Sequence, residues 1–136
     1  AWHLTDIALP SEDDERAVFG EADEAGLSAR FATYGHAVSV LKRAGCGPRQ
    51  LGTTQASPHF EKAKRVVDAT AAGDSFSGTF LAGYLQHESV AEAMAAAHKV
   101  ARHVVGHPGA IVSGKDYEQV KPDFAAMSPE RKTGDE

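Results

Sequence analysis

The residue types between positions 66 and 76 suit a site that binds an anion and accepts a proton. Two valines end an apolar stretch, and a turn of small residues then leads to Gly73 and Asp74 at the start of a predicted helix. The first amides of a helix have no intrahelical acceptor and lie at the positive end of its dipole, so an anion can bind there. A phosphoryl group in transfer is such an anion, and Asp74 could take a proton from an attacking hydroxyl.

The residues alone leave a second role open for Asp74. Aspartate is also a favoured capping residue at a helix start, where its carboxylate accepts a backbone amide. Both roles need the same residue type at the same place. The pattern by itself therefore does not separate a general base from a cap.

Alternating strands and helices are predicted to position this turn. Apolar or β-branched stretches bounded by turn residues predict strands over residues 4–9, 37–41, 49–52, 64–68 and 110–112. A helix with an acidic first turn is expected after Ser11, and another over residues 23–34. This alternation predicts an α/β layered fold with parallel strand pairing.

Two further helices follow from side-chain spacing. Phe76, Phe80 and Tyr84 recur every four residues, which marks one face of a helix over residues 74–85. Ser89 and Glu92 form a capping-box pattern, and the apolar spacing after them continues to residue 105. We therefore expect a pair of helices directly after the anion-binding turn.

Composition and charge exclude several classes of protein. The 136 residues suffice for one domain, and no apolar run approaches the roughly 20 residues that cross a bilayer. A net charge of −5 argues against a nucleic-acid surface. The single cysteine, Cys46, excludes an intramolecular disulfide and is interpreted as a loop thiol. These features predict a soluble, cytoplasmic protein with no nucleic-acid or membrane partner.

Four histidines invite a metal-site interpretation. His103 and His107 have the four-residue spacing of a helical ligand pair, and His87 and His98 lie nearby in sequence. Glycine and proline beside His107 end the helix, and no glutamate follows His103 to act as a base. Metal binding by these histidines is therefore not expected.

The stretch Val67-Asp68-Ala69-Thr70-Ala71-Ala72-Gly73-Asp74-Ser75-Phe76 resembles the C-terminal signature of the ribokinase-like (PfkB) carbohydrate kinases. Together with Leu9-Pro10-Ser11-Glu12-Asp13-Asp14-Glu15, it is most similar to the 2-keto-3-deoxygluconate kinases of that family. The resemblance covers about residues 5–113 and only the second half of a family member. It implies an incomplete ribokinase-like sheet with helices on both faces, a catalytic part over residues 1–113 and a polar C-terminal extension over 114–136.

The resemblance also implies roles for single residues. Asp74 matches the catalytic base, and the amides of Ala71, Ala72, Gly73 and Asp74 match the anion hole for the γ-phosphate of ATP. Further matches lie near the nucleotide: Glu15 to the Mg²⁺ and phosphate region, Lys42, Gly45 and Gly47 to a turn beside the phosphates, and His98 to the adenine pocket. The glycine of that turn sits one place later than in the family. Glu15 could instead be an exposed first-turn glutamate, and His98 a surface histidine.

A monovalent cation site is a further implication of the resemblance. Asp68, Thr70, Gly109 and Ser113 match loops that bind an activating cation such as K⁺ in many members. The competing interpretation of Asp68 is an ordinary aspartate at a strand end. Ala69 stands where the family usually has threonine, which puts cation coordination in doubt more than catalysis.

The predicted activity is phosphoryl transfer from ATP, with Mg²⁺, to a hydroxyl of a small sugar or sugar acid such as 2-keto-3-deoxygluconate. The alternatives are a kinase for another sugar, such as ribose or fructose, and a non-catalytic remnant or nucleotide-binding interaction module. The family's sugar-binding residues belong to the N-terminal half. We therefore expect the isolated chain to be inactive and to associate with itself or with a complementing N-terminal half.

Overall fold

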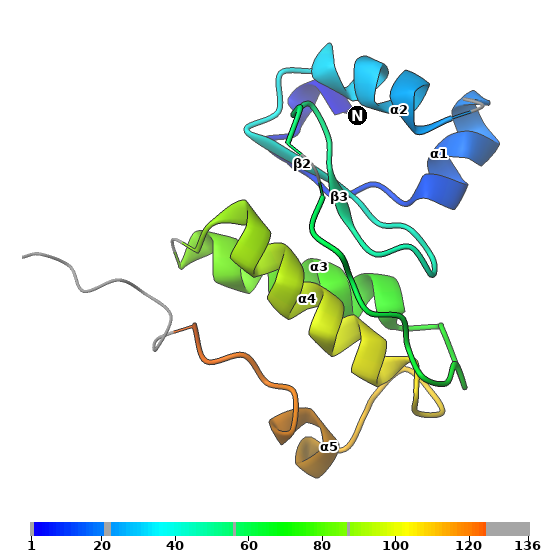
Figure 1. Ribbon diagram of the computed structural model, residues 1–136, viewed down its shortest axis with the longest axis vertical. Coiled ribbons are helices and arrows are strands. Elements are labelled where there is room, and N and C mark those ends of the chain that lie inside the picture. The colour runs from blue at the N-terminus through cyan, green and yellow to red at the C-terminus, as the bar shows by residue number, and fades with distance from the viewer. Residues whose placement is uncertain (1, 21–22, 56, 87, 125–136) are drawn as a thin grey trace, which may run out of the picture. The chain divides into compact units, whose positions relative to one another are not determined.

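The computed structural model describes residues 2–20, 23–55, 57–86 and 88–124. The chain divides into two compact units, Ala1–Lys64 and Arg65–Glu136. Figure 1 follows the chain through its helices and strands. Each unit is described by itself.

The unit Ala1–Lys64 contains a small mixed sheet. Its elements are the 3-10 turn η1 (Trp2–Leu4), β1 (Ile7–Ala8), α1 (Glu12–Phe19), α2 (Glu24–Ala32), β2 (Val38–Leu41) and β3 (Arg49–Gln50). The strand order is β1-β2-β3, with β1 and β2 parallel and β2 and β3 antiparallel. The predicted parallel pairing and return strand are thus confirmed. The first strand is shorter than the predicted 4–9, because η1 takes up its start and Pro10 has no amide to continue the ladder.

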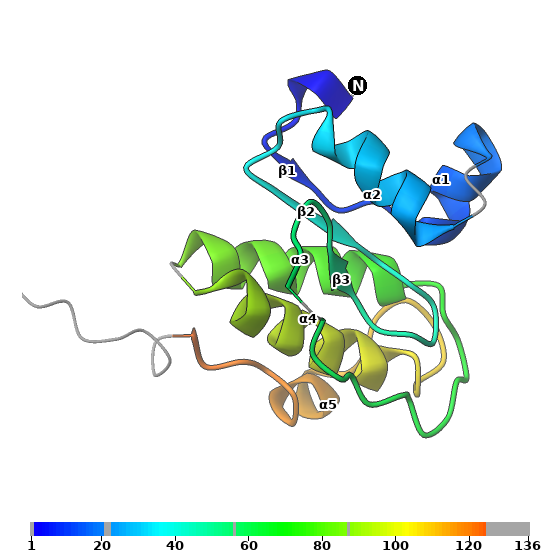
Figure 2. The same ribbon diagram turned by 45° about the horizontal axis from the view of Figure 1, so that its top comes forward.

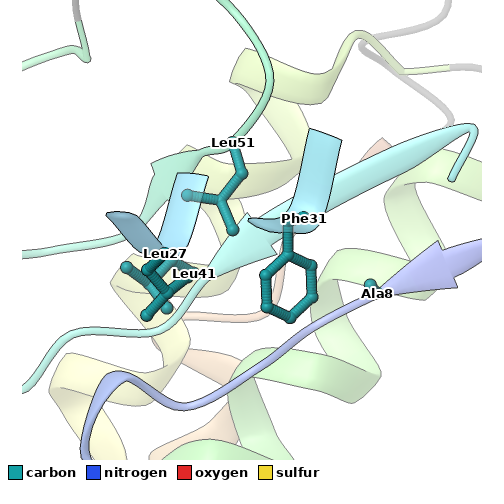
Figure 3. Close-up of a cluster of buried hydrophobic side chains, with 5 residues drawn as sticks. All are labelled: Ala8, Leu27, Phe31, Leu41 and Leu51. Atoms are coloured by element: carbon teal, nitrogen blue, oxygen red, sulfur yellow. The ribbon is translucent and has the colours of Figure 1, made fainter. Parts of the chain in front are cut away.

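Helix α2 covers one face of this sheet. Leu27 and Phe31 lie one turn apart on α2 and pack with Ala8, Leu41 and Leu51, as Figure 3 shows. Burial of a leucine or phenylalanine side chain contributes about 1.5–3 kcal/mol, so this cluster is a main source of stability in the unit. Asp23 begins the helix, where its Oδ1 accepts the Gly26 amide at 2.9 Å.

The turn between β2 and β3 depends on glycine. Gly45 and Gly47 have φ angles of 72° and 77°, in the left-handed region that other residues avoid. A Cβ atom on Gly47 would also come within 2.5 Å of Phe60. Arg43 closes the turn, because its Nε donates to the Gly47 carbonyl at 2.9 Å.

Helices dominate the unit Arg65–Glu136. They are α3 (Ala72–Leu85), α4 (Val90–Val104) and the short α5 (Gly114–Glu118). Figures 1 and 2 show α3 and α4 lying side by side. Phe76, Phe80 and Tyr84 stack along α3 with ring centroids 6.2 and 5.8 Å apart, which confirms the predicted four-residue period. The capping box at the start of α4 is also confirmed.

Two predicted strands in this unit are wrong. Residues 64–68 and 110–112 have no strand structure, and Val66 and Ile111 are 66% and 89% exposed. A strand needs a neighbouring strand to take up its backbone groups. The amides of Val67 and Asp68 instead donate to the Val105 carbonyl at the end of α4, at 2.7 and 3.2 Å.

The first part of the expected C-terminal extension carries structure. Helix α5, which was not predicted, is followed by the buried residues Val120 and Phe124. Val120 packs with Ala71, Val100 and Val104. The rest of the expected polar extension, residues 125–136, lies outside the described residues.

Candidate anion-binding and catalytic site

The start of α3 is the centre of the candidate site. Ala71 is the N-cap residue and Ala72 the first residue of the helix. Gly73 and Asp74 therefore occupy the second and third helical positions, whose amides have no acceptor within the helix. The Ala72 amide donates to the Ala69 carbonyl at 3.1 Å, so the turn itself uses one of the amides expected to meet an anion.

Packing below the turn holds this helix start in place. Ala71 is 7% exposed and lies in the cluster with Val100 and Val104 of α4. A larger side chain would not fit there without moving α4, because protein interiors are close-packed. The small residue at position 71 thus serves the core as well as access to the amides.

Asp74 is exposed and is not the N-cap residue of α3. With Ser75, Gly78 and Thr79 it lines one side of a cavity of about 490 Å³ within this unit. Valines of α4 and residues 110–112 line another part of the cavity wall. The carboxylate is therefore free to meet a hydroxyl group beside amides that can bind a phosphoryl group.

Asp68 joins two segments beside this turn. Its Oδ1 accepts the amide and the hydroxyl of Thr70, at 2.9 and 2.5 Å, and its Oδ2 accepts the Gly109 amide at 3.0 Å. The bonds from Thr70 and then the bond from Gly109 lower the pKa of Asp68 below its ordinary value, so the group is a carboxylate at neutral pH. Three of the four residues expected at the cation site are thus in direct contact.

The fourth residue of that set, Ser113, has other bonds. Its Oγ donates to Asp116 at 2.6 Å and accepts the Asp116 amide at 3.2 Å, which begins α5. Both carboxylate oxygens of Asp68 likewise already accept hydrogen bonds. A cation there would have to compete with these bonds, and the carboxylate of Asp68 is the charged oxygen ligand that the set offers.

His103, near the end of α4, contacts His107, which follows the helix. The rings of His103 and His107 are 4.5 Å apart, and His107 Nδ1 bonds to the His103 carbonyl at 2.9 Å. Among the described residues, no three histidine, cysteine or acidic side chains gather to hold a metal ion. His98 is half-buried on α4 and not fully at the surface, while His87 lies outside the described residues.

The unit Ala1–Lys64 holds the other residues expected near the nucleotide. Glu15 is 7% exposed, and its carboxylate binds Arg30 at 2.6 Å. The interpretation of Glu15 as an exposed glutamate is wrong, because Arg30 of α2 draws it inward and neutralises its charge. Lys42 directly follows β2, and its carbonyl accepts the Glu12 amide at 2.9 Å, so the starts of α1 and of the glycine turn lie side by side.

The ion pairs of three arginines near these residues were missed from the sequence. Arg30 lies 15 positions from Glu15, a separation that carries no periodic signal, and its guanidinium stacks over Phe19 at 3.9 Å. Arg43 binds Glu24 at 2.7 Å besides closing the glycine turn. Arg49 binds the same glutamate. Such ion pairs depend on how helices and turns pack, which local patterns do not encode.

Comparison with known proteins assigns the chain to a family. Residues 1–116 match the pfkB family of carbohydrate kinases. The chain belongs to this family. The pfkB assignment includes the α3 helix start, Asp74 and the Asp68 contacts, which all lie within the matched residues.

Individual pfkB relatives are similar over much of this chain. The 2-dehydro-3-deoxygluconokinase of Escherichia coli strain K12 is 35% identical over 112 residues, which make up 79% of the chain and 36% of the relative. The match to the Thermotoga maritima ribokinase structure covers 88% of this chain and 43% of the ribokinase chain, with a TM-score of 0.71 and 24% identity. An E. coli protein described as ribokinase II, solved with ATP and Mg²⁺, has a TM-score of 0.68 and is 25% identical. That match covers 80% of this chain and 35% of the ribokinase II chain.

These matches establish the ribokinase-like α/β fold that the sequence predicted. The chain spans little more than a third of the length of the curated relatives it matches. In the part of the pfkB chain that the structure describes, no helix is long and apolar enough to cross a membrane.

Proposed function

We propose that this pfkB chain carries the catalytic part of a kinase that transfers the γ-phosphoryl group of ATP to a hydroxyl of a small sugar or sugar acid. The observation that supports this most strongly is the start of α3, where exposed Asp74 lies next to helix amides that can bind an anion. The substrate we favour is 2-keto-3-deoxygluconate, because the E. coli relative is a 2-dehydro-3-deoxygluconokinase.

In the proposed reaction Asp74 accepts the proton of the attacking hydroxyl. The amides of residues 71–74, those of Gly73 and Asp74 foremost, stabilise the charge that develops on the transferred phosphoryl group. When bound, Mg²⁺ would neutralise phosphate charge. Asp74 and the amides come from the same helical turn, so a substrate hydroxyl and a phosphoryl group could be held in fixed relation to each other.

The remaining residues are proposed to act around the nucleotide. Lys42, Gly45 and Gly47 would approach its phosphates, and His98 its adenine. Glu15 would act on the Mg²⁺ region through its support of α1, since its carboxylate is bound to Arg30. Asp68, Thr70, Gly109 and Ser113 remain the candidates for a K⁺ site.

The proposal extends to organisation and location. We assign residues 1–113 to the catalytic part and 114–136 to a C-terminal extension, in a cytoplasmic enzyme. Sugar binding would require the part of the relatives that this chain does not cover. A kinase for ribose or fructose and a non-catalytic module are the alternatives, and the exposed Asp74 at the helix start favours a catalyst over a module.

The first test joins this chain to the uncovered part of the E. coli relative and measures ATP-dependent phosphorylation of 2-keto-3-deoxygluconate, ribose and fructose. The chain alone should be inactive and the joined protein active. Asp74→Asn should lower kcat by about two to four orders of magnitude, the scale of a general base. Glu118→Gln on α5 is the matched control and should leave kcat unchanged. Near-normal turnover by Asp74→Asn would reject the role of Asp74, and inactivity of the joined protein on every sugar would favour the non-catalytic module.

A further inference from the structure

Hydrogen bonds join residues 67–70 to residues 105–109, about 40 positions later in the sequence. The Val105 carbonyl accepts the amides of Val67 and Asp68, and the Asp68 carboxylate accepts the Gly109 amide. These bonds join the segment that enters α3 to the segment that leaves α4. Asp68 takes part through both its backbone and its side chain.

The Asp68 carboxylate is placed where its charge opposes phosphate binding. Two like charges repel, and Asp68 lies five residues before Gly73, the first helical residue whose amide could meet a phosphate. Its negative charge is offset by three donors, two from Thr70 and one from Gly109. One carboxylate oxygen thus binds Thr70 and the other binds Gly109.

We propose that Asp68 is a positioning residue that fixes the start of α3 by binding Thr70 and Gly109 at the same time. Thr70 directly precedes the N-cap residue Ala71, so its two bonds to Asp68 set the direction in which the chain enters the helix. The Gly109 bond anchors Asp68 in turn to the loop after α4. The consequence for catalysis rests on the proposed function, whereas the effect on the helix start does not.

Asparagine is the informative replacement at position 68. Its Oδ1 can still accept from Thr70, but its amide group would face the Gly109 N–H as a second donor, so the bond to the loop is lost. Thr70→Val removes the hydroxyl at nearly constant volume, and Thr70→Ser retains it. Asp116→Asn is the matched control, since the Asp116 carboxylate accepts the Ser113 hydroxyl at the start of α5 and not beside α3.

The test uses NMR on the 136-residue chain, with amide hydrogen exchange and titrations of ATP and adenosine. Asp68→Asn and Thr70→Val should speed exchange at residues 70–75 while the middle of α4 stays protected. Both should weaken ATP binding by about 3- to 10-fold, the scale of one hydrogen bond, and leave adenosine binding unchanged. Thr70→Ser and Asp116→Asn should behave as the unaltered chain does.

The readouts separate positioning from general stability. Unchanged exchange at residues 70–75 in Asp68→Asn overturns the proposal, and so does faster exchange throughout α4 or equal weakening of ATP and adenosine. If nucleotide binding is too weak to titrate, the exchange pattern alone decides. A localised exchange effect in a chain whose joined form phosphorylates no sugar would retain the positioning role and reject the proposed function.

Discussion

Individual carboxylates in this chain differ in role because their surroundings differ. Asp74 is exposed at a helix start, where its oxygens can meet a substrate. Asp68 is held by three donors, and Glu15 is buried against Arg30. The residue type at a helix start suggested a role for Asp74, and the family resemblance suggested roles for Asp68 and Glu15. Only the contacts separate the exposed carboxylate from the two that are already bound.

Glu88 offers a prediction on pH at this scale. It is 6% exposed, and its Oε1 has no hydrogen-bond partner among the residues that the structure describes. Burial raises the pKa of Glu88 above its ordinary value of 4.5. Charge repulsion by Glu92 and a hydrogen bond to that residue raise it further. The folded state therefore keeps the proton at a pH where the unfolded chain has released it, and stability is lost as pH rises through the folded pKa.

Glu88→Gln replaces this carboxyl with a neutral group of similar shape. We expect the variant to be more stable than the unaltered chain at neutral pH, and the difference to disappear as pH falls below the ordinary carboxyl range. Thermal unfolding from pH 3 to 8 measures it, with exposed Glu118→Gln as the control. Glu92, whose pKa is lowered mainly by the Ser89 hydroxyl, contributes in the opposite direction and remains in both proteins. A constant difference at every pH would contradict the prediction.

At the level of elements, the start of a helix is defined by capping contacts as well as by sequence pattern. Ser89 caps α4 fully, because its Oγ accepts the Glu92 amide and Glu92 accepts the Ser89 amide in return, at 3.2 and 3.0 Å. Ser11 occupies the same position before α1 but makes no side-chain capping bond. Its backbone instead pairs with Lys42.

This difference predicts unequal effects of the same substitution. Ser89→Ala should lower the free energy of unfolding by about 1 kcal/mol, the usual value of an N-cap. Ser11→Ala should change it by less than about 0.5 kcal/mol, as for a surface position without a special contact. Urea unfolding followed by circular dichroism measures both. Equal losses in the two variants would show that the capping contacts do not set the stability of these helix starts.

For the molecule as a whole, exposed apolar residues are prominent. Leu4, Val66 and Ile111 are 93%, 66% and 89% exposed, and the chain spans little more than a third of its curated relatives. Exposed apolar surface favours association, either with a second copy or with a complementing part of the protein.

We therefore expect the isolated chain to self-associate in a concentration-dependent way. Ile111→Lys should weaken association by about tenfold if this side chain is buried between copies, given the free energy of burying one aliphatic residue. Sedimentation velocity measures the association, and thermal unfolding of the variant checks that folding is unchanged. A monodisperse monomer at high concentration, with one cooperative unfolding transition, would rule out the expectation.

The sequence by itself determined the features that arise from local spacing. The aromatic face of α3, the capping box of α4, the parallel β1–β2 pairing and the helix start at Gly73-Asp74 all follow from periodicity, caps and small-residue turns. The family signature also lies in one continuous stretch, and residues 1–116 match the pfkB kinases.

Only the tertiary structure decided the features that need partners from distant parts of the chain. Residues 64–68 and 110–112 have the composition of strands, yet they bond to the end of α4, pack against its valines or stay exposed, because a strand needs a neighbouring strand for its backbone groups. Glu15 is buried because it forms an ion pair with Arg30, and Asp68 links two segments because it accepts the Gly109 amide. Hydrogen bonds and ion pairs act over a few ångströms in space, and the fold alone brings residues 15 or 41 positions apart to that distance.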